Sequence, residues 1–123
     1  MYKRQALTTK FTDDYKLDVD AYLSNIDVQI KSGIHGCVIA GSLGEASTLT
    51  QDEKVTLLTA TVSHVNGKIP IVMNIAEQST AEAVIAAQNA EENGANGLMM
   101  LPPMRYVSDD RETVEFYLSL IHI

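Results

Sequence analysis

A chain of 123 residues with 46% apolar and 20% charged residues has the composition of a folded soluble domain rather than of a disordered segment. Sixteen acidic residues against nine basic ones give a net charge of −7, and no lysine–arginine cluster occurs, so neither nucleic acid nor a membrane surface is expected as a partner. The one cysteine, Cys37, allows no internal disulfide, and no apolar run approaches the ~20 residues of a membrane span. A cytoplasmic location is therefore expected.

Predicted strands and helices alternate along the chain. A weak strand near Gln5–Thr9 is followed by a helix whose apolar residues run from Leu17 to Ile30, with Gly33 as its stop. The next predicted elements are a strand at 37–40, a helix from the capping box Thr50–Glu53 to Val62 before Gly67, and a strand at 70–76. The last are a helix from the capping box Ser79–Glu82 to Ala90 before Gly94, a strand at 97–101, and a helix that begins at Ser108–Asp110 and contains Val114, Phe116 and Tyr117.

The chain contains an internal repeat. Residues 33–40 read GIHGCVIA and residues 94–101 read GANGLMML, so each copy has two glycines three positions apart before four apolar residues. The copies are about two units of ~30 residues apart, which is the length of a strand with its crossover helix. Between them, NGKIPIVMNIA at 66–76 has the same order of features. The repeat therefore predicts successive strand–helix units.

The predicted strands favour a parallel sheet in an α/β fold. CVIA, PIVMNIA and GLMML are continuous apolar runs, which is typical of strands covered on both faces. Two architectures suit this order: a doubly wound open sheet, or part of a (β/α)₈ barrel, which in full needs roughly 250 residues. In both, the loops after the carboxyl ends of the strands build the functional site.

The loop after the second predicted strand has the strongest functional signal. It reads Gly41-Ser42-Leu43-Gly44-Glu45, and successive N–H groups in such a glycine turn can bind an anion. The Ser42 hydroxyl can bind a carboxylate or relay a proton, although a serine that bonds its own backbone explains the turn equally well. The spacing matches neither a nucleotide-binding glycine loop nor a nucleophile elbow.

Other candidate residues carry weaker signals. Arg105 and Tyr106 follow two prolines after the fourth predicted strand, where an arginine could pair with a carboxylate and a phenol could relay a proton. Glu77 at the end of the third strand could face a substrate, although an acidic residue of a helix N-terminus is the commoner explanation. The three histidines have no metal-ligand spacing to the cysteine or to carboxylates, so no metal site is predicted.

The run AGSLGEASTLTQDEK at 40–54 resembles the G-T/S-T-G-E-x-x-x-L-x-x-x-E signature of the dihydrodipicolinate synthase / N-acetylneuraminate lyase family. ALTTKF at 6–11 resembles that family's opening A-L-x-T-P-F, with Lys10 where proline is usual, and the later strand segments fall in family order. The resemblance extends to about Tyr117. It implies a (β/α)₈ TIM barrel, of which residues 1–123 would form about the first four βα units and the N-terminal half of a single domain.

The resemblance also implies an activity. Members are lyases or synthases that form a Schiff base between a lysine and pyruvate or another 2-oxo acid, without a cofactor, and then carry out aldol condensation, cleavage or dehydration. By position, Ser42 corresponds to the family's relay and carboxylate-binding hydroxyl, and Gly41 and Gly44 keep the turn. Leu43 stands where a second hydroxyl residue is usual, so only its N–H could bind the carboxylate.

Further expectations concern the assembled protein. Tyr106 would correspond to a family tyrosine that reaches into a neighbouring subunit's site, although the alignment with the family's Pro-Tyr-Tyr pattern could shift by one residue. The resemblance also implies a homo-oligomer (dimer or tetramer) for a full-length chain. The family's Schiff-base lysine and second relay tyrosine would lie beyond residue 123. A tail after about Tyr117 without amphipathic spacing suggests a truncated chain that is inactive alone.

Two alternatives to this reading remain at the level of sequence. One is a non-catalytic α/β domain that binds a small anion or a partner chain. The other is an unrelated βα enzyme whose glycine turn resembles the signature by chance.

Overall fold

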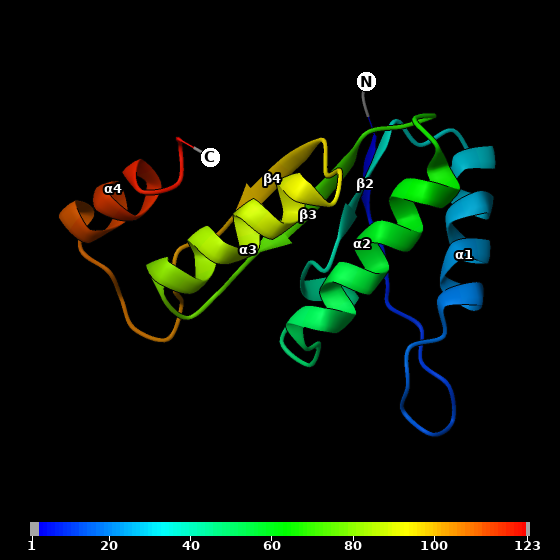
Figure 1. Ribbon diagram of the computed structural model, residues 1–123, viewed down its shortest axis with the longest axis horizontal. Helices are drawn as coiled ribbons and strands as arrows, with labels where there is room; N and C mark the ends of the chain where they lie inside the picture. Colours follow the sequence, from blue (N-terminus) through cyan, green and yellow to red (C-terminus); the bar gives the residue numbers. More distant parts are fainter. Residues whose placement is uncertain (1–2, 123) are drawn as a thin grey trace.

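The computed structural model describes residues 3–122, which form a four-stranded parallel sheet with its helices (Figure 1). The elements, in chain order, are β1 (Arg4–Ala6), α1 (Val19–Lys31), β2 (Gly36–Ile39), the 3₁₀ turn η1 (Ser42–Gly44), α2 (Gln51–Val65), β3 (Ile71–Ile75), α3 (Thr80–Glu92), β4 (Gly97–Met100) and α4 (Asp110–Leu118). Every predicted helix and strand is present, so the alternating order is confirmed. None of the helices in this part of the chain is both long and apolar enough to cross a membrane.

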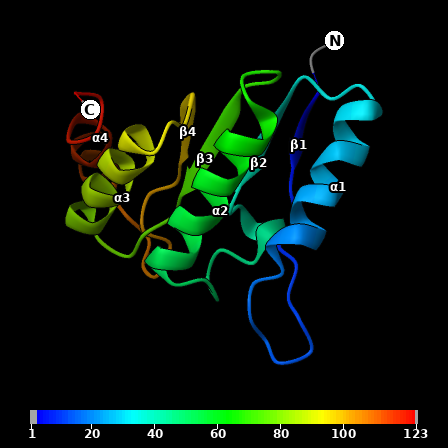
Figure 2. The same cartoon turned by 45° about the vertical axis from the view of Figure 1, so that its right-hand side comes forward.

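The strand order separates the two architectures that the sequence allowed. The strands lie in the order β1-β2-β3-β4, and all three neighbouring pairs are parallel. A doubly wound sheet reverses its strand order and covers both faces with helices, whereas a barrel adds each strand beside the previous one. Figures 1 and 2 show α1, α2 and α3 on the same side of the sheet. The arrangement is therefore that of consecutive βα units of a barrel.

The hydrophobic core lies between the sheet and these helices. Alternate strand residues point into it, among them Cys37 and Ile39 of β2 and Met73 and Ile75 of β3. From the helices, Ile26 of α1 joins the core, as do Leu57 and Leu58 of α2 and Ala83, Ala87 and Ala90 of α3. Burial raises the pKa of the Cys37 thiol to about 11, so this residue stays a neutral apolar side chain in the folded chain.

The opposite face of the sheet is only partly covered. Val38, Val72 and Met99 lie on it and line a cavity of about 440 Å³, and Met99 is 39% exposed. The expectation of burial on both faces therefore holds for β2, whose four residues are all buried, but is wrong for β4. The two strands differ in burial because β4 lies at the edge of the sheet, whereas β2 has a neighbouring strand on each side.

The repeated glycines have the same two roles in both copies of the repeat. Gly33 and Gly94 follow the ends of α1 and α3 with φ of +82° and +87°, a conformation that terminates helices and favours glycine. Gly36 and Gly97 are the first residues of β2 and β4. The repeat therefore corresponds to two equivalent helix-to-strand connections.

The helix starts follow their sequence signals closely. The reciprocal capping box at Thr50 and Glu53 forms as predicted. At the start of α3 the Ser79 hydroxyl accepts from the Glu82 N–H, but it donates to the Glu82 carboxylate, so only half of that box forms. The fourth helix is capped by Asp109, which forms a full box with Glu112.

The first strand differs from its predicted form, and the structure adds detail on the tail after Tyr117. The first strand covers Arg4–Ala6 rather than 5–9, because pairing with β2 ends after the bond from the Leu7 N–H to the Val38 carbonyl. The tail after Tyr117 forms a last helical residue and a turn in which Leu120 is buried and Ile121 is 61% exposed. Ile123 lies outside the described residues.

Candidate functional site

The turn between β2 and α2 lies at the carboxyl end of the sheet and has an unusual backbone. Ala40 and Glu45, on either side of Gly41–Gly44, have φ of +51° and +55°, a region that costs non-glycine residues free energy. Gly41 has φ of −78°, so the positive φ angles fall on the two residues that flank the glycines. Strain of this kind is typical of functional sites, where the surrounding structure holds it in place.

Gly44 is needed for space rather than for φ. A Cβ at this position would lie 2.9 Å from the Leu7 carbonyl oxygen, and the Thr9 hydroxyl donates a 2.6 Å hydrogen bond to the Gly44 carbonyl. The turn is thereby packed against the segment that follows β1. At Gly41, by contrast, a Cβ would meet only the Met99 side chain at 4.0 Å.

Replacing Gly44 with alanine is expected to lower the free energy of unfolding by about 1–3 kcal/mol, because the added methyl must displace backbone. Urea denaturation followed by circular dichroism measures the change. Gly41→Ala is the matched control in the same turn and should change stability by less than half as much. Equal losses in the two variants would contradict this account of Gly44.

Ser42 lies at the edge of a cleft of about 540 Å³ at this end of the sheet. The cleft is lined by Ser42, Ala46, Ser47, Leu49, Thr50, Gln51, Lys54, Asn74, Ala76, Glu77, Gln78, Leu101 and Met104. Residues after β2, β3 and β4 thus converge with the first turn of α2, as expected for the carboxyl end of a parallel sheet. Ser42 itself is exposed, and neither its N–H nor that of Leu43 donates to a backbone carbonyl within the described chain.

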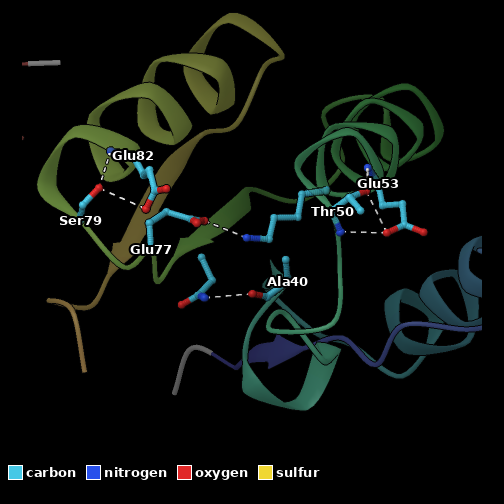
Figure 3. Close-up of polar contacts among 8 residues, drawn as sticks. Ala40, Thr50, Glu53, Glu77, Ser79 and Glu82 are labelled. Carbon is cyan, nitrogen blue, oxygen red and sulfur yellow. Dashed lines mark hydrogen bonds and ion pairs between the residues drawn. The ribbon is translucent and has the colours of Figure 1, made fainter. Parts of the chain in front are cut away.

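Sequence reasoning missed an ion pair that forms one wall of the cleft. The Lys54 ammonium of α2 donates to a carboxylate oxygen of Glu77, just after β3, at 2.8 Å (Figure 3). The two side chains are only 10% and 12% exposed. Of the two roles that the sequence left open for Glu77, the position in the cleft agrees with the one facing a site, and the carboxylate also joins the end of β3 to α2. No local pattern reports this pairing, because the residues are 23 positions apart.

Asn74 is the other site residue that sequence reasoning missed. It belongs to β3, is 3% exposed, and donates from Nδ2 to the Ala40 carbonyl at 2.9 Å. This bond fixes Ala40, the residue with positive φ that precedes Gly41 in the turn (Figure 3). The sequence feature that could have indicated Asn74 is the presence of an amide residue within the apolar run IVMNI.

Two predicted site residues do not reach the cleft. The Leu43 side chain is 64% exposed, and Leu43 is not among the residues of the cleft wall. Tyr106 is 68% exposed and borders a separate cavity of about 320 Å³ with Phe116 and Glu112 of α4. In its place Met104 lines the cleft. The structure therefore brings Ser42 together with Lys54, Asn74 and Glu77, but not with Tyr106.

Consecutive parallel strands, helices on one face and a glycine turn beside a cleft at the carboxyl ends of the strands are the arrangement of four βα units of a TIM barrel. The model of the dihydrodipicolinate synthetase family matches residues 4–123. The chain belongs to this family, which confirms the resemblance.

Curated relatives agree with this assignment. A 4-hydroxy-tetrahydrodipicolinate synthase from Xylella fastidiosa is 38% identical over 99 residues, which cover 80% of this chain and 33% of the relative. An uncharacterized DapA-like lyase from Halobacterium salinarum is 32% identical over 111 residues, which cover 90% of this chain and 36% of the relative. The chain thus spans about a third of the length of these relatives.

Solved structures agree on the fold. A putative dihydrodipicolinate synthetase from Pseudomonas aeruginosa superimposes with a TM-score of 0.92 at 27% identity, over 98% of this chain and 42% of that one. A chloride-inhibited dihydrodipicolinate synthase from Acinetobacter baumannii, complexed with pyruvate, superimposes with a TM-score of 0.95 at 23% identity, again over 98% and 42%. The four βα units therefore correspond to part of a TIM barrel.

Proposed function

We propose that this chain provides the carboxylate-binding part of a site that acts on pyruvate or a related 2-oxo acid by Schiff-base aldol chemistry. The observation that carries the proposal is the strained Gly41–Gly44 turn, which presents Ser42 at a cleft at the carboxyl end of the sheet. In this assignment the N–H groups of Ser42 and Leu43 bind the carboxylate, and the Ser42 hydroxyl relays a proton. The structures of two family relatives contain pyruvate, which supports this substrate class.

The lysine that forms the Schiff base is proposed to lie outside these 123 residues. The attacking amine must be neutral, because a protonated amine has no lone pair with which to attack the keto carbon. Lys54 lines the cleft, but its ammonium is held by Glu77 at 2.8 Å. The other five lysines are exposed and lie outside the cleft wall: Lys3, Lys10, Lys16, Lys31 and Lys68. The chain alone is accordingly proposed to be inactive, as the N-terminal half of a barrel domain.

Tyr106 is proposed to act in an oligomer of the complete enzyme. It is exposed and does not line the cleft of its own chain, so it is available to a neighbouring subunit. One solved relative is described as the first monomeric dihydrodipicolinate synthase variant, which suggests that association is usual among its relatives.

Borohydride trapping tests the proposal. The imine that a lysine forms with pyruvate is reduced to a stable amine, which mass spectrometry locates on a peptide. The 123-residue chain alone should give no adduct. The chain co-expressed with the remaining C-terminal part of the Xylella fastidiosa relative should give one, on a lysine of the added part. An adduct on Lys54 would contradict the assignment, and so would a folded, pyruvate-binding hybrid that traps nothing.

The second candidate is a non-catalytic α/β domain that binds a small anion or a partner chain. The partly covered sheet face with Val38, Val72 and Met99 favours it, because such a face can receive another polypeptide. Anion binding at Ser42 without trapping in any folded hybrid would support this candidate over the first.

A further inference from the structure

Asn74 has one polar atom that the fold leaves without a partner. Its Nδ2 donates to the Ala40 carbonyl at 2.9 Å, whereas its Oδ1 is buried and has no hydrogen-bond partner among residues 3–122. The carbonyl of Ala40 fixes this orientation of the amide, because only the NH₂ group can donate to it. Buried acceptors without a partner are rare in folded proteins and call for an explanation.

The position of Asn74 indicates what the free acceptor serves. Asn74 is 3% exposed and lines the cleft that Ser42 borders. It lies on the sheet face opposite the helices, since Met73 and Ile75 on either side of it pack into the helix-facing core. Across the sheet it pairs with Met99 of β4, whose side chain offers no hydrogen-bond donor.

The chemistry of the atom limits the ligand group that it can bind. An amide oxygen accepts hydrogen bonds, whereas the carboxylate and keto oxygens of a simple 2-oxo acid also only accept. A ligand hydroxyl is the matching donor. A site with a buried acceptor also discriminates strongly, because a ligand that lacks the donor leaves that acceptor unpaired.

We infer that Asn74 is a specificity-determining residue that accepts a hydrogen bond from a hydroxyl of the bound 2-oxo acid. Its amide joins two functions: Nδ2 holds the Ala40 carbonyl at the start of the turn, and Oδ1 selects a hydroxylated substrate. This inference rests on the proposed function, because it assumes that the acid's carboxylate binds at the Ser42 turn.

Matched ligand pairs test the inference on the ¹⁵N-labelled 123-residue chain. The pairs are 3-hydroxypyruvate with pyruvate, and 4-hydroxy-2-oxobutanoate with 2-oxobutanoate, so each pair differs by one hydroxyl. Titration followed by NMR gives the dissociation constants, and the Asn74 side-chain NH₂ signal reports on the amide itself. In at least one pair the hydroxylated acid should bind about tenfold more tightly and shift the Asn74 signal, while both acids shift the Ser42 N–H signal.

Asn74→Leu should abolish the preference, so that the two acids of the pair bind within about twofold of each other. Asn25→Leu, a part-buried asparagine of α1 outside the cleft, is the control and should keep the tenfold ratio. A structural role for Asn74 would weaken both acids equally and leave the ratio unchanged. If Asn74→Leu does not fold, the ratio of the two dissociation constants measured on the unmodified chain still tests the inference.

The outcomes separate the two proposals. Equal affinities within both pairs, with the Ser42 signal shifting, would overturn the role of Asn74 and leave the 2-oxo acid site standing. Failure of all four acids to shift the Ser42 signal, together with absent trapping in the hybrid, would overturn the proposed function and this inference with it.

Discussion

Replacing Ser42 with alanine is expected to lower the turnover number of the assembled enzyme by about 100-fold or more, within the 10²–10⁴ range of general acid–base catalysis. The hydroxyl lies at the cleft on a turn whose N–H groups are assigned to the carboxylate, so it is placed to pass protons to the reacting atoms. The measurement is the steady-state rate of 2-oxo acid turnover by the chain combined with a C-terminal half-barrel. The loss should fall mainly on the turnover number, because the N–H groups that bind the carboxylate remain.

Ser63→Ala is the matched control for this experiment. Ser63 is an exposed serine on α2, and it does not line the cleft. Its replacement should leave the rate unchanged. An unaltered rate in Ser42→Ala, with trapping still observed, would remove Ser42 from the proton relay and leave the turn as a carboxylate-binding element only.

Replacing Glu77 with glutamine is expected to lower the free energy of unfolding by about 3–5 kcal/mol, because the Lys54 ammonium would be left buried without its charge partner. Lys54→Met should cost a similar amount by leaving the carboxylate unpaired. The loss is large because both side chains are nearly 90% buried, so water screens the pair only weakly. Urea denaturation monitored by circular dichroism measures both variants.

The double variant Lys54→Met/Glu77→Leu distinguishes a lost ion pair from lost packing. Removal of both charges leaves no buried ion, so the double variant should lose much less than the sum of the two single losses. The exposed pair of Lys16 with Asp14 supplies the control, and Lys16→Met should produce no measurable change. Additive losses in the double variant would show that the two side chains act independently of their pairing.

The order of elements could be predicted from sequence because local rules govern it. Apolar runs marked the strands, a full capping box at Thr50 and Glu53 marked the start of α2, and Gly33 and Gly94 ended helices with positive φ. The family followed from the signature around Ser42, and the family match over residues 4–123 confirms it. These features depend on residues close together in the chain, so the sequence by itself determined them.

Contacts between distant segments required the tertiary structure. Whether the sheet was barrel-like or doubly wound depended on strand order, which the local patterns left open. The pairing of Lys54 with Glu77 and the bond from Asn74 to Ala40 join residues 23 and 34 positions apart. The close packing of Gly44 against Leu7 and Thr9 likewise joins segments more than 30 positions apart.

The sequence by itself therefore determined the βα units, the family and the candidate hydroxyl Ser42, because each is encoded in a short stretch. Only the tertiary structure showed which side chains share the cleft with Ser42 and which, such as Tyr106, do not. The physical reason is that a parallel sheet brings together the carboxyl ends of strands that are separated in sequence by whole helices.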